Sequence, residues 1–166
     1  MEADAVIEEA ERLESLRDRA DGVAALYRRE YLPMVRLAHL ITGSNEVAED
    51  VVQEAFVRMY KSWDRADQPA AYLRRIVVNG CNSWHRRRRL EREHLPRPVA
   101  EAVDPEAREL LDALARLGLR QRTALVLRYY ADMSEADVAL ALGCRPGTVK
   151  SLVHRGLRQL EGMIER

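Results

Sequence analysis

The chain has 166 residues, of which 47% are hydrophobic and only 5% aromatic. Alanine, leucine, arginine and glutamate are abundant, and all are strong helix formers, whereas no β-branched run bounded by turns indicates a strand. No apolar stretch reaches the roughly 18 residues that a membrane-spanning helix needs. The start, Met1 to Ala5, lacks the basic and then apolar profile of a secretory signal. We therefore expect an all-α protein of the cytoplasm, without membrane insertion.

Cysteine and histidine give no sign of a metal site. Cys81 and Cys144 lie far apart, with no CxxC or Cys/His cluster, which favours a reducing compartment. The four histidines show no ligand spacing: His39, His85, His94 and His154. We expect no metal, no cofactor and no catalytic residue.

The formal net charge is +0, but the charges are segregated along the chain. Residues 1–21 hold eight acidic residues against three arginines, a net charge of −5. Residues 70–93 hold seven arginines against two glutamates, a net charge of +5. This pattern suggests a polyanionic partner met by particular faces, although solvated surface explains any one patch equally well.

Prolines divide the chain in two. Pro96, Pro98 and Pro105 interrupt any helical period, so residues 94–104 are predicted to be a linker. The expected organisation is an acidic leader (1–23), a helical N-terminal domain (24–93), the linker, and a C-terminal domain (105–166). For the leader we favour a helix around Ala5–Arg19, while a disordered extension or a shield for a basic patch stays open.

Three helices are predicted in the N-terminal domain, at about 24–42, 46–63 and 70–89. Gly43-Ser44-Asn45 forms the first break, and Pro69 takes the favoured first-turn position of the third helix. In the helix 46–63 the core stripe consists of Val47, Val51, Val52, Ala55, Phe56, Met59 and Trp63. The other side gathers Asp50, Gln53, Glu54 and Val57, which is either solvated surface or a docking patch for a basic partner helix.

The helix 70–89 separates an apolar stripe from a polar one. The apolar stripe consists of Leu73, Ile76, Val77, Gly80 and Trp84, and the polar one of Arg75, Asn79, Asn82 and Arg86. Asparagine is unfavourable in mid-helix, so two of them on a solvent face invite a functional explanation. Amides and guanidinium groups bind base edges and phosphate, and the run Arg86–Arg89 suits a DNA backbone. A basic, solvated helix end is the alternative.

The C-terminal domain has the outline of a helix-turn-helix. Asp104-Pro105 begins a helix that carries Leu110, Leu114 and Leu117 and ends at Gly118. A helix follows at about 120–131. Ser134 with Asp137 forms a capping box for a short helix that ends at Gly143, and Pro146 begins the last helix, about 146–164.

The last helix has a packing face and a cationic face. Val149, Val153, Leu157 and Leu160 fall within one quadrant, whereas the opposite face holds Lys150, Ser151, His154, Arg155 and Arg158. A helix that enters the major groove needs this division. An ordinary amphipathic surface helix remains the alternative.

Two segments resemble a known family. MSEADVALALGCRPGTVKSLVHRGLRQL resembles the promoter-binding C-terminal domain of sigma factors, although response-regulator-type activators carry a similar motif. AEDVVQEAFVRMYKSW followed by YLRRIVVN is similar to the N-terminal domain of sigma factors of the extracytoplasmic-function group. The order of the two domains is also theirs, and the likeness covers roughly residues 24–90 and 108–164.

This resemblance implies a protein that docks on core RNA polymerase and directs initiation at promoter DNA, with an anti-sigma factor as a further candidate partner. Asp50, Gln53, Glu54 and Val57 would bind the clamp helices of the largest polymerase subunit. The loop Trp63–Ala71 would hold an unstacked base of the opened strand. The implied −10 contacts are Trp63, Tyr72, Arg75, Asn79, Asn82, Ser83, Arg86 and Arg87. The implied −35 contacts are Arg128, Arg145, Thr148, Lys150, Ser151, His154, Arg155 and Arg158.

The chain departs from the family pattern at three positions. Leu152 stands where the family usually has arginine, Arg145 replaces the usual serine cap, and Tyr129 replaces a glutamate. Two other functions compete with the sigma factor. A stand-alone helix-turn-helix regulator would bind a palindromic site as a dimer, and a helical enzyme or metal protein would need ligands or paired carboxylates around a pocket.

Overall fold

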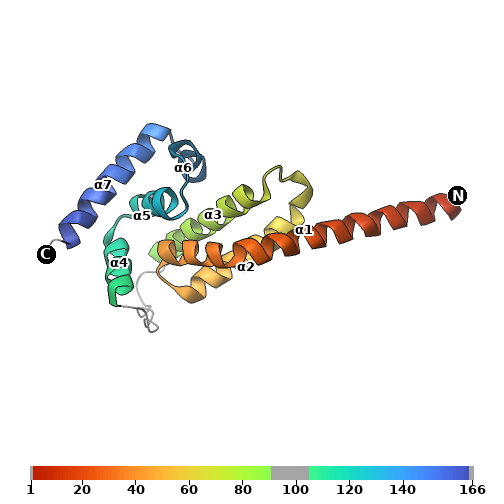
Figure 1. Cartoon of the computed structure of the whole chain (residues 1–166), viewed down its shortest axis with the longest axis horizontal. Coiled ribbons are helices and arrows are strands. Elements are labelled where there is room, and N and C mark those ends of the chain that lie inside the picture. Colours follow the sequence, from red (N-terminus) through yellow and green to blue (C-terminus); the bar gives the residue numbers. More distant parts are fainter. Residues whose placement is uncertain (1, 91–104, 165–166) are drawn as a thin grey trace.

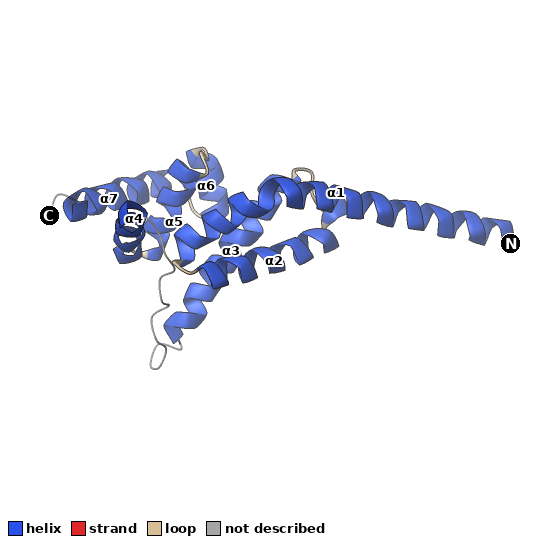
Figure 2. Cartoon of the chain, turned by 60° about the horizontal axis from the view of Figure 1, so that its bottom comes forward, coloured by secondary structure: helices blue, strands red, loops and turns tan. Residues whose placement is uncertain are grey.

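The computed structural model describes residues 2–90 and 105–164, and within these ranges it contains helices and no strand (Figure 2). The N-terminal half consists of α1 (Glu2–Thr42), α2 (Asn45–Lys61), the 3₁₀ turn η1 (Trp63–Arg65) and α3 (Pro69–Leu90). The C-terminal half consists of α4 (Pro105–Arg116), α5 (Leu119–Leu125), the π-helical turn η2 (Val126–Tyr130), α6 (Glu135–Leu142) and α7 (Pro146–Ile164). No helix in the described ranges is both long and apolar enough to span a bilayer. The expected linker and the Asp104 cap lie outside the described residues.

The first helix is longer than the sequence pattern indicated. α1 runs without a break through the acidic leader and the predicted helix 24–42, and its first part projects away from the other helices (Figure 1). Val6, Ile7 and Leu13 in that part are more than half exposed, whereas Leu26, further along, is buried. The helix therefore packs only from about its midpoint onward.

The N-terminal bundle ends and restarts its helices where the sequence indicated. Gly43 follows α1 with a φ of 76°, a left-handed conformation that glycine adopts without steric cost. The Ser44 side chain then accepts a hydrogen bond from the backbone N–H of Val47 at 3.4 Å, which caps α2. α1, α2 and α3 bury their apolar faces against one another.

α3 buries a wider face than the predicted stripe. Leu73 and Val77 of that stripe are fully buried, but so are Val78 and Cys81, which the periodicity did not single out. The reason is that α3 contacts α5 and α6 as well as α1 and α2. Gly80 permits the close approach of α2, because a Cβ there would lie 2.8 Å from Cγ1 of Val51.

The helix-turn-helix forms as predicted. The Ser134 hydroxyl accepts from the Asp137 N–H at 3.1 Å and caps α6, and Gly143 ends that helix with a φ of 59°. Val149 and Leu152 of α7 are buried. α4 differs in one respect: Leu110 is 48% exposed, while Leu114 and Leu117 are buried as expected.

The two halves pack against each other. One continuous hydrophobic cluster includes Leu37 and Val77 of the N-terminal half and Leu127 and Val138 of the C-terminal half. Leu40 of α1 packs against a second cluster, formed by Leu114, Leu117 and Leu125. The C-terminal helices consequently lie beside α1 and α3 (Figure 1).

The two cysteines should differ sharply in reactivity. Burial raises the pKa of the Cys81 thiol to about 12, so almost no thiolate exists at pH 8, whereas Cys144 is partly exposed. We expect iodoacetamide to modify Cys144 and spare Cys81, as measured by peptide mass spectrometry, and to modify both in urea. Equal rates in the folded chain would contradict the buried position of α3.

Replacing Leu152 by the arginine that the resemblance leads one to expect should destabilise the C-terminal half. Leu152 is 7% exposed, so Leu152→Arg would bury a cation without a partner and lower the free energy of unfolding by about 3 kcal/mol. Urea denaturation measures this. The neighbouring, exposed Ser151→Arg is the control and should change stability little.

Candidate nucleic-acid interface

The polar stripe of α3 forms one open face. Arg75, Asn79 and Arg86 are exposed, and Asn82 and Ser83 are half-buried beside them. The Arg86 guanidinium donates to the Ser83 hydroxyl at 3.0 Å. The Arg75 guanidinium lies over the ring of Tyr72, 5.1 Å from its centroid. These contacts hold long cationic side chains in place along the helix, which reduces the entropy that binding would cost.

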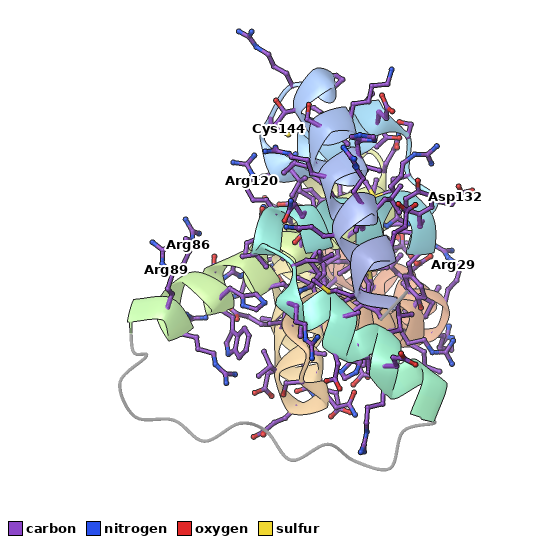
Figure 3. All side chains as sticks on the ribbon, turned by 90° about the vertical axis from the view of Figure 1, so that its left-hand side faces the viewer. Arg29, Arg86, Arg89, Arg120, Asp132 and Cys144 are labelled. Atoms are coloured by element: carbon purple, nitrogen blue, oxygen red, sulfur yellow. The ribbon has the colours of Figure 1, made fainter. Side chains whose placement is uncertain are left out.

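The end of α3 carries the densest positive charge. Arg86, Arg87 and Arg89 are exposed, and the guanidinium of Arg88 lies 5.0 Å from the centroid of the Trp84 ring. Figure 3 shows Arg86 and Arg89 pointing away from the body of the molecule. Adjacent like charges repel one another, and a phosphate backbone relieves that repulsion while it releases counterions.

Trp63 belongs to the turn η1, because α2 ends at Lys61, two residues before the predicted end. Its indole lies against Gly22 of α1, where a Cβ would come within 2.3 Å of Cζ2 of the ring. Asp64 beside it pairs with Arg19, whose guanidinium also lies over the Tyr60 ring. The turn is therefore fastened to α1, and Trp63 is only half-buried.

A pocket of about 480 Å³ lies next to Trp63. Three of its polar lining residues were not singled out from the sequence: Arg29, Gln68 and Arg74. The Nε atom of Arg74 is buried and has no hydrogen-bond partner, so it is a donor available to a ligand. No periodic signal could reveal this pocket, because it forms only where α1, η1 and α3 meet.

The cationic face of α7 is fully open. Thr148, Lys150, Ser151, His154, Arg155 and Arg158 are all exposed, as is Arg145 before the helix. The Ser151 hydroxyl donates to the Gly147 carbonyl at 3.1 Å, and Arg155 Nε donates to the Ser151 carbonyl at 3.1 Å. These local bonds leave the remaining guanidinium nitrogens of Arg155 free of that carbonyl.

Arg128 lies apart from this face. It is half-buried, donates to the Met133 carbonyl at 3.1 Å and lies 3.9 Å from the Asp132 carboxylate. Its side chain thus holds the turn that follows η2, where Asp132 has a φ of 48°. Tyr129, next to it, is 63% exposed.

The polar face of α2 is separate from both. Asp50, Gln53 and Glu54 are exposed, and Val57 is 55% exposed among them. Arg58 donates to the Glu54 carboxylate at 2.6 Å, an exposed pair that contributes little to stability. A valine in the middle of acidic and amide groups suits a mixed polar and apolar contact.

The structure joins the α3 face to the C-terminal half and leaves the α7 face apart. Arg75, Asn79, Asn82 and Arg86 line a groove of about 560 Å³ whose other wall includes Leu119, Arg120 and Leu140. Figure 3 shows Arg120 on the same side of the molecule as Arg86 and Arg89. No group of three or more possible metal ligands occurs within the described ranges.

Comparison with known proteins agrees with the two halves. Residues 26–91 match the family model of sigma-70 region 2, and residues 107–160 match that of sigma-70 region 4. The chain is 37% identical over 136 residues to the RNA polymerase sigma-E factor of Streptomyces coelicolor, covering 76% of this chain and 77% of that protein. It is 33% identical to the ECF RNA polymerase sigma factor SigE of Mycolicibacterium smegmatis, covering 85% of this chain and 61% of the relative.

Two solved structures share the fold. The sigma factor RpoE from Bartonella quintana, in complex with the anti-sigma factor NepR, aligns with a TM-score of 0.75 at 24% identity, over 85% of this chain and 97% of that one. CnrH, in complex with the cytosolic domain of CnrY, aligns with a TM-score of 0.69 at 23% identity, over 90% and 94%. With both sigma-70 regions present in order and relatives of this identity, the chain belongs to the extracytoplasmic-function group of RNA polymerase sigma factors.

Proposed function

We propose that this sigma factor docks on core RNA polymerase and directs promoter-specific initiation by reading a −10 element with residues 24–93 and a −35 element with residues 105–166. The observation that carries the proposal is the presence of two exposed faces of donors and cations, on α3 and on α7, in a chain of this family. The relatives favour this function over a stand-alone regulator, because they are named as polymerase sigma factors.

The α2 face is the docking surface for the polymerase in this proposal. Asp50, Gln53 and Glu54 supply carboxylates and an amide, and the exposed Val57 supplies the apolar contact. A basic helix pair of the largest subunit would complement this face in charge. The interaction does not compete with DNA, because the cations of α3 and α7 lie on other surfaces.

The pocket beside Trp63 supports strand capture. Its aromatic wall and the orphan donor of Arg74 suit an unstacked base, and the aromatic contact contributes roughly 1–3 kcal/mol. Tyr72, at the start of α3, supplies a second ring close to Arg75. In this scheme the protein positions and stabilises DNA strands and performs no bond chemistry, in the cytoplasm.

Two weak DNA contacts then act together. The segment 94–104 joins them, and a common polymerase scaffold raises the effective concentration of the second contact once the first has formed. Free sigma factor accordingly binds promoter DNA poorly. An anti-sigma factor is a further proposed partner, supported by the complexes in which the two structural relatives were solved.

Reversing the charge at the docking face should abolish function without unfolding the protein. Glu54 is exposed on α2, so Glu54→Arg places a cation against a basic partner and should lower transcription at least tenfold, since one repelled contact of about 1.4 kcal/mol has that effect. Run-off transcription with core polymerase measures this. Glu49→Arg, also exposed on α2, is the matched control. Full activity of Glu54→Arg would refute the docking face.

Removing one reading side chain from each domain should alter promoter choice. Asn79→Ala and Lys150→Ala truncate exposed groups, and each should weaken its own element by about 1–3 kcal/mol while the fold stays intact. Transcription from a promoter library, with start sites mapped by sequencing, measures the change. Gln159→Ala, exposed on α7, is the control. Unchanged start-site choice in both variants would contradict the assigned faces.

A further inference from the structure

A buried arginine joins the two halves of the molecule. Arg122 of α5 is only 7% exposed. Its Nη1 donates to the Ile41 carbonyl of α1 at 2.8 Å, and its Nη2 donates to the Ala115 carbonyl of α4 at 2.8 Å. No carboxylate within the described residues pairs with it. The charge is therefore neutralised by backbone alone.

Both acceptors lie at the C-terminal end of a helix. α1 ends at Thr42 and α4 at Arg116, each one residue after the carbonyl that Arg122 binds. The last four carbonyls of a helix lack partners within it, and the helix dipole makes this end negative. One guanidinium thus satisfies an orphan carbonyl of each half and lies at the negative ends of two helices.

The Ile41 carbonyl is a junction of three helices. His85 of α3 places its Nε2 2.9 Å from the same oxygen that Arg122 binds. Beside this point Leu40 packs among leucines of the C-terminal half. The bond to Arg122 is therefore surrounded by apolar packing, in which an unsatisfied guanidinium is costly.

The groove next to the junction contains the reading face of α3. Its wall opposite Asn79 and Asn82 consists of Leu119, Arg120, Leu140 and neighbouring residues of α5 and α6. Leu140 is 76% exposed and also lines a second groove, together with Arg65, Arg74 and Arg75. α5 and α6 consequently stand where DNA would approach the α3 face.

We propose that Arg122 holds this sigma factor closed, so that α5 and α6 obstruct the −10-reading face until the two halves separate. This inference rests on the proposed function, because it concerns the regulation of the same face. Closure lowers the apparent affinity for DNA by the fraction of molecules that are open. Docking on polymerase selects the open form, which makes promoter reading depend on the enzyme.

The test compares domain separation and DNA binding in the full-length chain without polymerase. Dyes at the exposed positions Lys61 and Glu161, each changed to cysteine in a Cys144→Ser background, report the separation by single-molecule energy transfer. The probe is the fluorescein-labelled non-template strand of a promoter on which the wild-type holoenzyme initiates, and anisotropy measures its binding to the unlabelled chain.

Arg122→Met keeps an apolar stem and removes both hydrogen bonds. We expect it to shift the population to low energy transfer and to tighten binding of the strand at least about tenfold, as release of a closed state populated at 90% or more requires. Arg116→Met, which removes an exposed cation from the last turn of α4, is the matched control and should change neither quantity. A folded Arg122→Met chain with unchanged transfer and unchanged binding overturns the proposal.

A second pair of variants avoids the buried site, in case Arg122→Met fails to fold. Leu140→Lys places a cation opposite Arg75 and should open the molecule, whereas Leu140→Glu places an anion there and should keep it closed. Equal energy transfer in the two variants contradicts closure. The proposed function fails separately, if the wild-type chain initiates nowhere with core polymerase. Closure fails alone if initiation occurs but these variants have no effect.

Discussion

Helix ends control the arrangement of this molecule. The chain is almost entirely helical in its described ranges, so most backbone groups are satisfied within each helix, and the exceptions lie at the termini. Where a terminus faces solvent, water supplies the missing partners. Where it is buried, a side chain must do so, and at Ile41 two of them do, from α3 and from α5. The packing of the halves follows from that requirement together with the leucine contacts around it.

The distribution of charge complements this packing. A net charge of +0 conceals cations concentrated on α3 and α7 and an acidic first part of α1. Several of these cations lie on or beside aromatic rings: Arg19 on Tyr60, Arg75 on Tyr72 and Arg88 on Trp84. Such contacts fix the direction of a long side chain and leave its charge available to an anion. The faces are thus prepared for a polyanion before one binds.

The separation of roles among the helices has a simple physical origin. Each helix of a small bundle has one face to bury and one to expose, and the exposed face is available for a partner. α2 exposes acids and amides, α3 exposes asparagines and arginines, and α7 exposes lysine, serine, histidine and arginine. Three partners or DNA elements can therefore be contacted by one chain without any pocket of catalytic type.

Local chemistry in the sequence determined the helices, their caps and the faces of α2, α3 and α7. Ser44, Gly43, Ser134 and Gly143 fix helix ends through hydrogen bonds and φ angles that depend on adjacent residues alone. Period 3.6 separates Lys150 from Val149 in any context. The family was also accessible from two local motifs.

Only the tertiary structure decided which groups from distant segments meet. The pocket beside Trp63 depends on contact between α1 and η1, and the groove along Asn79 on contact between α3 and α6. Nothing in the spacing of Arg122 indicated burial, since an arginine on a short helix normally faces water. Its position follows from two distant helix ends that approach it in the folded chain, and sequence periodicity carries no information about such long-range encounters.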